Sequence, residues 1–235
     1  MARVDNVIRQ RLSSQVPLID QIAHYIVNAG GKRIRPRLLL LFSEALCYRG
    51  DARYELAATV EFIHTATLLH DDVVDESSLR RGRSTANALF GNAASVLVGD
   101  FLYSRAFQMM VSVNNMRVLS VLADATNTIA EGEVLQLMNM HDPDLAIEDY
   151  LRVIRFKTAR LFEASARLGA ILGGADPALE ETCASCGRAL AECDREDLDQ
   201  HADGGNREQE RRRLGEDTAD PVENAFVAAE AGAGV

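Results

Sequence analysis

The chain has 235 residues, of which 47% are apolar and 6% aromatic, with no tryptophan. This length and composition allow a sizeable core in one large domain or two small ones. Most of the formal net charge of −10 belongs to residues 191–235, and neither they nor the nearly neutral residues 1–190 have the basic charge of a nucleic-acid binder. No apolar run is long enough to span a bilayer. The polar N-terminus has no signal-peptide pattern. We therefore expect a soluble, cytoplasmic chain that is not an integral membrane protein.

Apolar residues recur at three- and four-residue steps from about residue 5 to about residue 190, which indicates helices throughout. Turn-type clusters separate them, and we find no alternating strand pattern and no internal repeat. Pro36 suits the first turn of the second helix. The expected helices cover residues 16–29, 37–47, 52–75, 93–112, 117–138, 147–172 and 177–190. The predicted fold class is all-α, a bundle of long helices.

The composition changes near residue 190. Residues 191–235 hold 13 acidic residues against 5 arginines, and only six of their 45 residues are Leu, Val or Phe. Such a segment has too few apolar residues to build a core. We expect two parts: a helical body over residues 1–190 and an acidic tail over residues 191–235, disordered apart from a short helix around 207–214.

The stretch "LLHDDVVDESSLRRGR" over residues 68–83 places three carboxylates directly before three arginines. On a helix that turns about 100° per residue, Asp71 and Asp75 share a face with Thr67 and His64, while Asp72 points elsewhere. Two carboxylates one turn apart suit Mg²⁺, which favours oxygen ligands and completes its shell with water and phosphate. A lone motif of this kind is more often a solvated helix end.

Basic residues on both sides of these carboxylates argue against the solvated helix end. Arg80, Arg81 and Arg83 follow directly, and "GGKRIRP" over residues 30–36 precedes a helix start. Arginine pairs with phosphate through two hydrogen bonds, and helix N-termini favour anions. One acidic and two basic sites predict two polyphosphate groups, one held through a metal and one held directly.

Five segments resemble the trans-prenyl diphosphate synthases, most closely the bacterial long-chain octaprenyl type that makes the quinone side chain. They read "GGKRIRPRL", "EFIHTATLLHDDVVDESSLRRGRSTAN", "GNAASVLVGDFLYSRAFQMM", "IAEGEVLQL" and "KTARLFEASA". The resemblance covers residues 4–190 and implies an isoprenoid synthase-type helical bundle around a central cavity, in a homodimer. It also implies an Mg²⁺-dependent prenyltransferase that condenses isopentenyl diphosphate with an allylic diphosphate such as farnesyl diphosphate.

The resemblance also implies roles for single residues. Asp71 and Asp75 would bind Mg²⁺ with the allylic diphosphate, with Asp72 supporting them and Arg80 contacting that diphosphate. Lys157 and Thr158 would contact the same substrate. The isopentenyl diphosphate site would be made by four residues: Lys32, Arg35, His64 and Arg81. Taken alone, each of these residues would more often be structural or solvated.

The resemblance further predicts a long product. In this family, the residues four and five positions before the first aspartate stand at the cavity floor. Here they are Thr67 and Ala66, which are both small and would let the product elongate.

The family carries a second aspartate-rich motif on a later helix, and none is found after residue 190. We therefore expect either a frameshift or an unrelated ending there, and impaired synthase activity. Cys183, Cys186, Cys193 and His201 offer a weak alternative, a zinc site whose spacing matches no standard finger.

Two rival functions remain open on the sequence alone. The first is a non-catalytic partner subunit of a heteromeric prenyl synthase, which the missing second motif favours and the intact first motif disfavours. The second is a terpene cyclase or another Asp-rich helical enzyme, which would have no use for the "GGKRIRP" site.

Overall fold

The computed structural model describes residues 1–28, 30–139 and 145–192, which belong to one compact unit, Met1–Glu192. The described residues are overwhelmingly helical, so the all-α prediction is confirmed. The proposed tail helix around 207–214 lies outside the described residues. Among the described helices, none is both long and apolar enough to cross a membrane.

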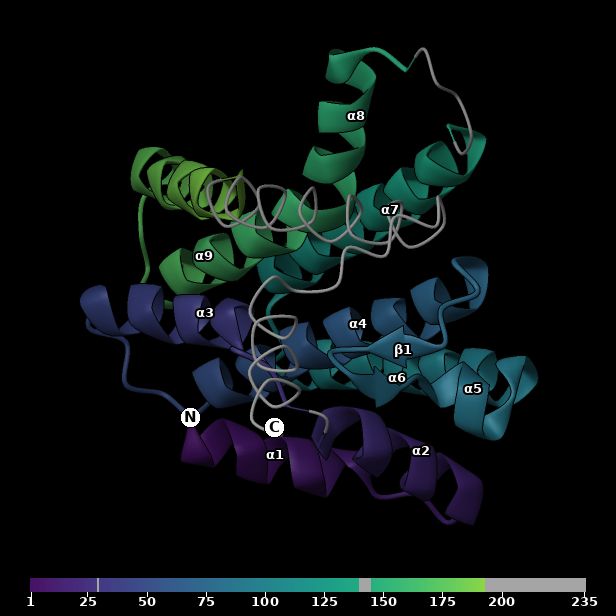
Figure 1. Cartoon of the computed structure of the whole chain (residues 1–235). Helices are drawn as coiled ribbons and strands as arrows, with labels where there is room; N and C mark the ends of the chain where they lie inside the picture. Colours follow the sequence, from purple (N-terminus) through teal and green to yellow (C-terminus); the bar gives the residue numbers. More distant parts are fainter. Residues whose placement is uncertain (29, 140–144, 193–235) are drawn as a thin grey trace, which may run out of the picture. The chain divides into compact units, whose positions relative to one another are not determined.

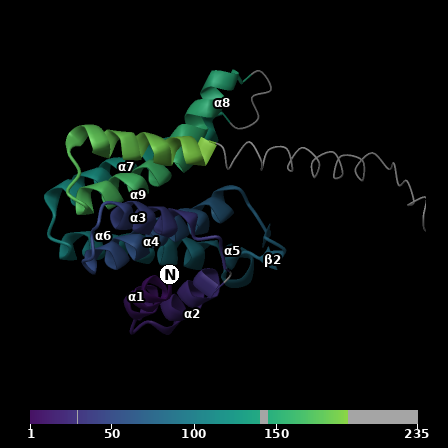
Figure 2. The same ribbon diagram turned by 90° about the vertical axis from the view of Figure 1, so that its left-hand side faces the viewer.

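The helices of this unit are arranged in three layers (Figures 1 and 2). The first layer holds α1 (Ala2–Leu12) and α2 (Pro17–Asn28). The middle layer holds α3 (Ile34–Ala45), α4 (Ala52–Val74) and α6 (Asn92–Ser112). The third holds α7 (Met116–Met138), α9 (Arg160–Leu172) and a helix over residues 177–192, with α8 (Ile147–Ile154) extending from it.

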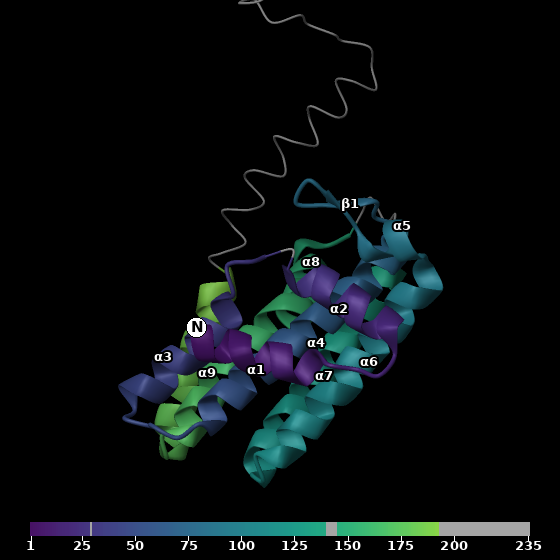
Figure 3. The same ribbon diagram turned by 90° about the horizontal axis from the view of Figure 1, so that it is seen from below.

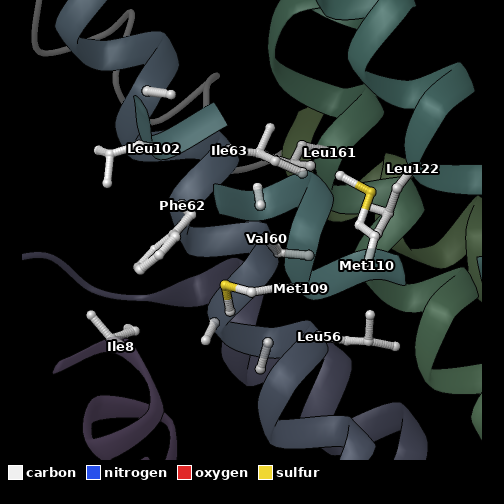
Figure 4. Close-up of a cluster of buried hydrophobic side chains, with 14 of the residues drawn as sticks. Ile8, Leu56, Val60, Phe62, Ile63, Leu102, Met109, Met110, Leu122 and Leu161 are labelled. Atoms are coloured by element: carbon white, nitrogen blue, oxygen red, sulfur yellow. The ribbon is translucent and has the colours of Figure 1, made fainter. Parts of the chain in front are cut away.

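The core surrounds α4, which packs against α1, α3, α6 and α9. Figure 4 shows Val60, Phe62 and Ile63 of this helix among Leu102, Met109 and Met110 of α6, all of them at most 1% exposed. On the outer side, α1 buries Val4, Ile8 and Leu12 at four-residue steps and lies across the bundle (Figure 3). Because α4 is buried on nearly all sides, its neighbours determine the position of the residues at its C-terminal end.

The expected single helix over residues 147–172 is wrong in detail. Between α8 and α9, residues Arg155–Ala159 form a π-helical turn, η1. Such wide turns inside α-helices occur frequently at functional sites. Gly132 of α7 lets this turn approach closely, because a Cβ atom there would lie 2.9 Å from the Lys157 backbone nitrogen.

Three further expectations need correction. The helix expected over residues 37–47 corresponds to α3, which begins at Ile34, so Pro36 lies inside its first turn. Residues 79–84, expected to be an irregular turn, form a small antiparallel hairpin of β1 (Leu79–Arg80) and β2 (Arg83–Ser84). A short helix, α5 (Ala86–Phe90), follows it and was not anticipated. Two-residue strands are too short to show an alternating pattern in the sequence.

Candidate functional site

The two carboxylates expected to bind a cation lie at the C-terminal end of α4. Asp71 is in the last turn with a side chain only 12% exposed, and Asp75 is the exposed C-cap residue. Asp71 Oδ2 lies 3.3 Å from the Lys157 Nζ atom of η1. The fold therefore brings together Asp71 and Lys157, which are far apart in the sequence.

Two residues of α7 complete the surroundings of this lysine. Lys157 Nζ lies 2.7 Å from Glu133 Oε2 and donates to Gln136 Oε1 at 3.0 Å. The Gln136 amide nitrogen also donates to Asp75 Oδ1 at 3.5 Å. Our assignment of site residues omitted Glu133 and Gln136. Their three-residue spacing within "IAEGEVLQL", one of the segments that resembles the family, was the available signal.

Burial is the main reason that the pKa of Glu133 rises to about 7, and the neighbouring Asp71 carboxylate raises it further. The hydrogen bond from Lys157 opposes this rise. Oε1 of Glu133 is buried and has no hydrogen-bond partner in the described part of the chain. Two carboxylates thus share one ammonium group, which is a concentrated negative environment suited to a further cation.

Asp72 faces away from this pair, as the helical spacing predicts. Its side chain is 1% exposed, and its Oδ1 accepts hydrogen bonds from Arg80 Nε at 3.0 Å and Nη2 at 2.8 Å. Arg80 is expected to contact a diphosphate, but one side of its guanidinium group is already paired with Asp72. Asp72 links α4 to the hairpin that follows it.

The basic residues gather around the side of α4 that bears His64. Arg81 Nη1 donates to the Gly30 carbonyl at 2.9 Å, which connects the hairpin to the "GGKRIRP" turn. Arg35 lies over the Phe162 ring at 4.5 Å. Burial, and then Arg35, Arg80 and Arg81, hold the pKa of His64 well below its usual value. His64 is therefore neutral near pH 7 and lies among three cations.

Two non-glycine residues of this basic cluster adopt the left-handed conformation: Arg33 with φ +48° and Arg81 with φ +52°. Arg33 occupies the N-cap position of α3, and its Nη1 lies 3.1 Å from Glu61 Oε1. Burial raises the pKa of Glu61 although Arg33 lowers it. Strained backbone of this kind is found mainly where the surrounding structure enforces it, often at binding sites. No pattern in the sequence predicts the Arg33–Glu61 pair.

The four remaining predicted residues differ in how exposed they are. Lys32 is exposed in the "GGKRIRP" turn, and Thr158 is half-buried in η1 beside Lys157. Thr67 is half-buried on the Asp71 face of α4. Ala66 is fully buried in the core cluster and so does not line an open space in this structure.

A pocket of about 450 Å³ lies elsewhere, between α7 and α8. Asn127, Glu131 and Val134 line it from the face of α7 opposite Glu133 and Gln136, together with Arg152 and Phe156. Its lining is largely apolar and contains none of the predicted site residues.

The donors at Asp71 and Asp75 fit a metal that takes few protein ligands. The described residues contain no group of three or more His, Cys, Asp or Glu side chains able to hold a metal ion. Two carboxylates suit Mg²⁺ with a diphosphate better than an all-protein site. The zinc alternative depends on Cys193 and His201, which lie outside the described residues.

Comparison with known proteins gives one consistent result. The family model described as "Polyprenyl synthetase" matches residues 16–193. The chain is 55% identical to octaprenyl diphosphate synthase of Escherichia coli over 92% of its own length and 67% of that protein. It is 49% identical to an all-trans-nonaprenyl-diphosphate synthase of Rhodobacter capsulatus over 74% of its own length and 54% of that protein.

Solved structures agree. A decaprenyl diphosphate synthase from Rhodobacter capsulatus matches with a TM-score of 0.79 and 52% identity, over 81% of this chain and 59% of that one. A polyprenyl synthase from Caulobacter crescentus complexed with calcium and isoprenyl diphosphate matches with a TM-score of 0.79 and 49% identity, over 81% and 58%. The chain thus spans between about half and two thirds of the length of these relatives.

Proposed function

Because the chain belongs to the polyprenyl synthetase family, we propose that it acts in the condensation of isopentenyl diphosphate with an allylic diphosphate such as farnesyl diphosphate. The product would be a long-chain all-trans polyprenyl diphosphate, a precursor of quinone side chains. The names of the bacterial relatives, which include octaprenyl, nonaprenyl and decaprenyl diphosphate synthases, support a product of this class.

The observation that most supports this proposal is the division of α4 between two charged sites. Asp71 and Asp75 lie with Lys157 at its C-terminal end, while His64 lies among Arg35, Arg80 and Arg81. The first site suits a diphosphate that arrives with a metal ion, and the second suits a diphosphate bound directly. A reaction between two diphosphate substrates needs both.

In the proposed reaction, Asp71 and Asp75 would hold Mg²⁺, and the allylic diphosphate would bind beside them with that ion. When bound, Mg²⁺ supplies positive charge that offsets the charge developing on the departing diphosphate. Lys157, whose ammonium group lies 3.3 Å from Asp71 Oδ2, adds positive charge beside the same diphosphate, and Thr158 of the same turn assists it. Lys32, Arg35 and Arg81 hold isopentenyl diphosphate, with neutral His64 as a further hydrogen-bonding partner. Arg80, held by Asp72, adds positive charge between the two sites.

The two binding sites can be tested on the 235-residue chain directly. We expect calorimetry to detect binding of isopentenyl diphosphate without metal, and binding of the non-hydrolysable farnesyl thiodiphosphate only with Mg²⁺. Asp71→Asn should abolish binding of farnesyl thiodiphosphate and leave binding of isopentenyl diphosphate intact. Arg81→Ala should abolish binding of isopentenyl diphosphate and leave that of farnesyl thiodiphosphate intact. Loss of binding of both ligands in each variant, or metal-independent binding of both ligands, would contradict the assignment.

Product formation from isopentenyl and farnesyl diphosphates is measured on the same preparation. The impaired turnover expected from the sequence stays a prediction, and this assay tests it. A chain that binds neither substrate unless a second prenyl synthase chain is added would point instead to the partner-subunit function. No described contact favours that alternative.

We also propose a homodimer, supported by an apolar stripe on α6. Val96, Leu97, Phe107 and Val111 are between 36% and 67% exposed, and helical spacing places them within about 100° of arc. An exposed stripe of this kind indicates a protein contact. Light scattering should give twice the mass of the chain, and Leu97→Asp should shift it to the monomer; an unchanged mass for Leu97→Asp would exclude this stripe. The expected cytoplasmic location stays a prediction.

A further inference from the structure

Lys157 is held from two directions by side chains of other helices. Its ammonium group has three N–H donors, and three oxygens surround it: Asp71 Oδ2 at 3.3 Å, Glu133 Oε2 at 2.7 Å and Gln136 Oε1 at 3.0 Å. The lysine side chain is 16% exposed. A side chain with four rotatable bonds is thus confined to one position, although lysine normally keeps substantial rotamer freedom.

The backbone reinforces this arrangement. Lys157 belongs to the π-helical turn η1, and Gly132 of α7 allows the two backbones to approach closely. Glu133 directly follows this glycine, and Gln136 lies one turn further along α7. The two α7 acceptors are therefore placed by the same close helix crossing that brings Lys157 into the site.

Gln136 has a fixed orientation in this network. An ammonium group only donates hydrogen bonds, so the Gln136 oxygen faces Lys157 and its amide nitrogen faces Asp75. Asp75 lies beyond the end of α4 and is exposed, so the helix itself constrains its side chain little. Gln136 thereby joins the lysine to the second carboxylate of the α4 site.

We propose that Glu133 and Gln136 are positioning residues, which hold the Lys157 ammonium in line with Asp71 and Asp75 for the diphosphate bound there. This inference rests on the proposed function and adds two residues to that site. Neither α7 residue needs to contact the substrate. Their contribution is to remove, before binding, the rotamer freedom that Lys157 would otherwise lose when the diphosphate binds.

The first test measures this positioning without any ligand. We would record the ¹⁵Nζ signals of the lysine ammonium groups by NMR, with Lys157→Arg used to assign Lys157. The wild-type chain should give a distinct, slowly exchanging Lys157 signal. Gln136→Leu and Glu133→Ala should broaden or remove it, while Glu133→Gln, which keeps an acceptor oxygen, should retain it in part. An unchanged signal in both Gln136→Leu and Glu133→Ala would overturn the proposal.

The second test is a double-mutant cycle on binding of inorganic pyrophosphate with Mg²⁺, measured by calorimetry on the full chain. Loss of an ordered hydrogen bond to a charged group corresponds to an increase in Kd of about 10-fold, which we expect for Gln136→Leu. In a Lys157→Ala background the same substitution should change Kd by less than about twofold, because no ammonium remains to be positioned.

Glu131→Gln is the matched control, because Glu131 lies on the same helix and is exposed on the other face. It should leave both the Lys157 signal and the Kd unchanged. If Gln136→Leu lowers the melting temperature, the polar variant Gln136→Ser replaces it, since its short side chain no longer reaches Lys157 or Asp75.

The outcomes separate the two proposals. A wild-type chain that binds no Mg²⁺–pyrophosphate contradicts the proposed function, and the NMR experiment still decides the positioning of Lys157. A wild-type chain that binds, with Gln136→Leu binding equally well, contradicts the positioning role alone. A loss that persists in the Lys157→Ala background shows that Gln136 acts on the diphosphate site without the lysine, and also contradicts it.

Discussion

Arg80 holds the buried carboxylate of Asp72, with Nε and Nη2 both donating to Oδ1 at 3.0 and 2.8 Å. The aspartate has a side chain only 1% exposed, whereas that of the arginine is 36% exposed. The middle aspartate of the acidic motif thus anchors the basic segment that follows it. The acidic and basic halves of residues 68–83 are held in one fixed arrangement.

Removing this anchor should destabilise the chain. Arg80→Ala leaves the Asp72 carboxylate buried without its partner, and we expect the free energy of unfolding to fall by about 2–3 kcal/mol. Urea denaturation monitored by circular dichroism measures the change. Arg83→Ala, which removes an arginine that lies over the Tyr25 ring, should cost less than about 1 kcal/mol. Equal losses in the two variants would show that the Asp72 pair has no special role.

His64 should report the binding of a diphosphate. Its pKa in the free chain lies well below 6.5, because burial and three arginines disfavour the imidazolium. A lowered histidine pKa means that the unfolded chain binds more protons, so stability falls as the pH drops below about 6.5. A bound anion should raise this pKa by offsetting the arginines. NMR titration of the His64 ring with and without inorganic pyrophosphate measures the shift, and an identical pKa in both would place the anion elsewhere.

Ala66 and Thr67 should respond differently to enlargement. Ala66 is fully buried in the core, so Ala66→Phe should overpack it and lower the free energy of unfolding by about 1–3 kcal/mol or more. Thr67→Phe, on the partly exposed face, should be tolerated and should shorten the product of any synthase activity. The chain-length role expected for both residues stays a prediction. Melting temperatures test the expected loss of stability in Ala66→Phe, and product chromatography tests the expected shorter product of Thr67→Phe. A longer or unchanged product from Thr67→Phe would refute its predicted role in chain length.

Gly132 should be sensitive to the smallest addition. A Cβ atom there would lie 2.9 Å from both the Lys157 backbone nitrogen and the Phe156 Cβ, so one of the two backbones would have to shift. We expect Gly132→Ala to lower the free energy of unfolding by about 1–3 kcal/mol despite the better helix propensity of alanine. Ser120→Ala, on the exposed face of the same helix, is the control. A gain in stability for Gly132→Ala would mean that η1 and α7 are not in close contact.

The helix over residues 177–192 should depend on Glu180 for its attachment. The Glu180 side chain is 3% exposed and accepts hydrogen bonds from Arg117 at 2.7 and 2.9 Å and from Arg167 at 3.1 Å. Glu180→Ala removes these hydrogen bonds from both arginines, of which Arg167 keeps Glu163 and Glu181, and should cost about 1–3 kcal/mol. The neighbouring Glu181 is 55% exposed, so Glu181→Ala should cost less than about 1 kcal/mol. Thermal and urea denaturation compare them, and similar losses would rule out a specific role for the buried carboxylate.

Local patterns in the amino-acid sequence were enough to predict the helical class, most helix boundaries and the residue types of the site. Periodicity predicted these elements because their buried apolar residues recur at three- and four-residue steps, as Leu56, Val60 and Ile63 do in α4. Helical spacing also separated Asp72 from Asp71 and Asp75 correctly, since that geometry is local. The family followed from motifs, which are long and ordered enough to compare directly.

Contacts between residues of different helices could not be predicted in this way. Nothing local indicates that Glu133 and Gln136 face Lys157, because their contact depends on the close crossing of α7 and η1 at Gly132. The π-helical turn itself has no periodic signature in five residues. The burial of Ala66, which the family resemblance placed at the cavity floor, likewise comes from packing in the core cluster. Helical geometry depends on residues that are close in the sequence and can be predicted from it. Burial and contacts between distant helices depend on how the helices pack in the folded bundle.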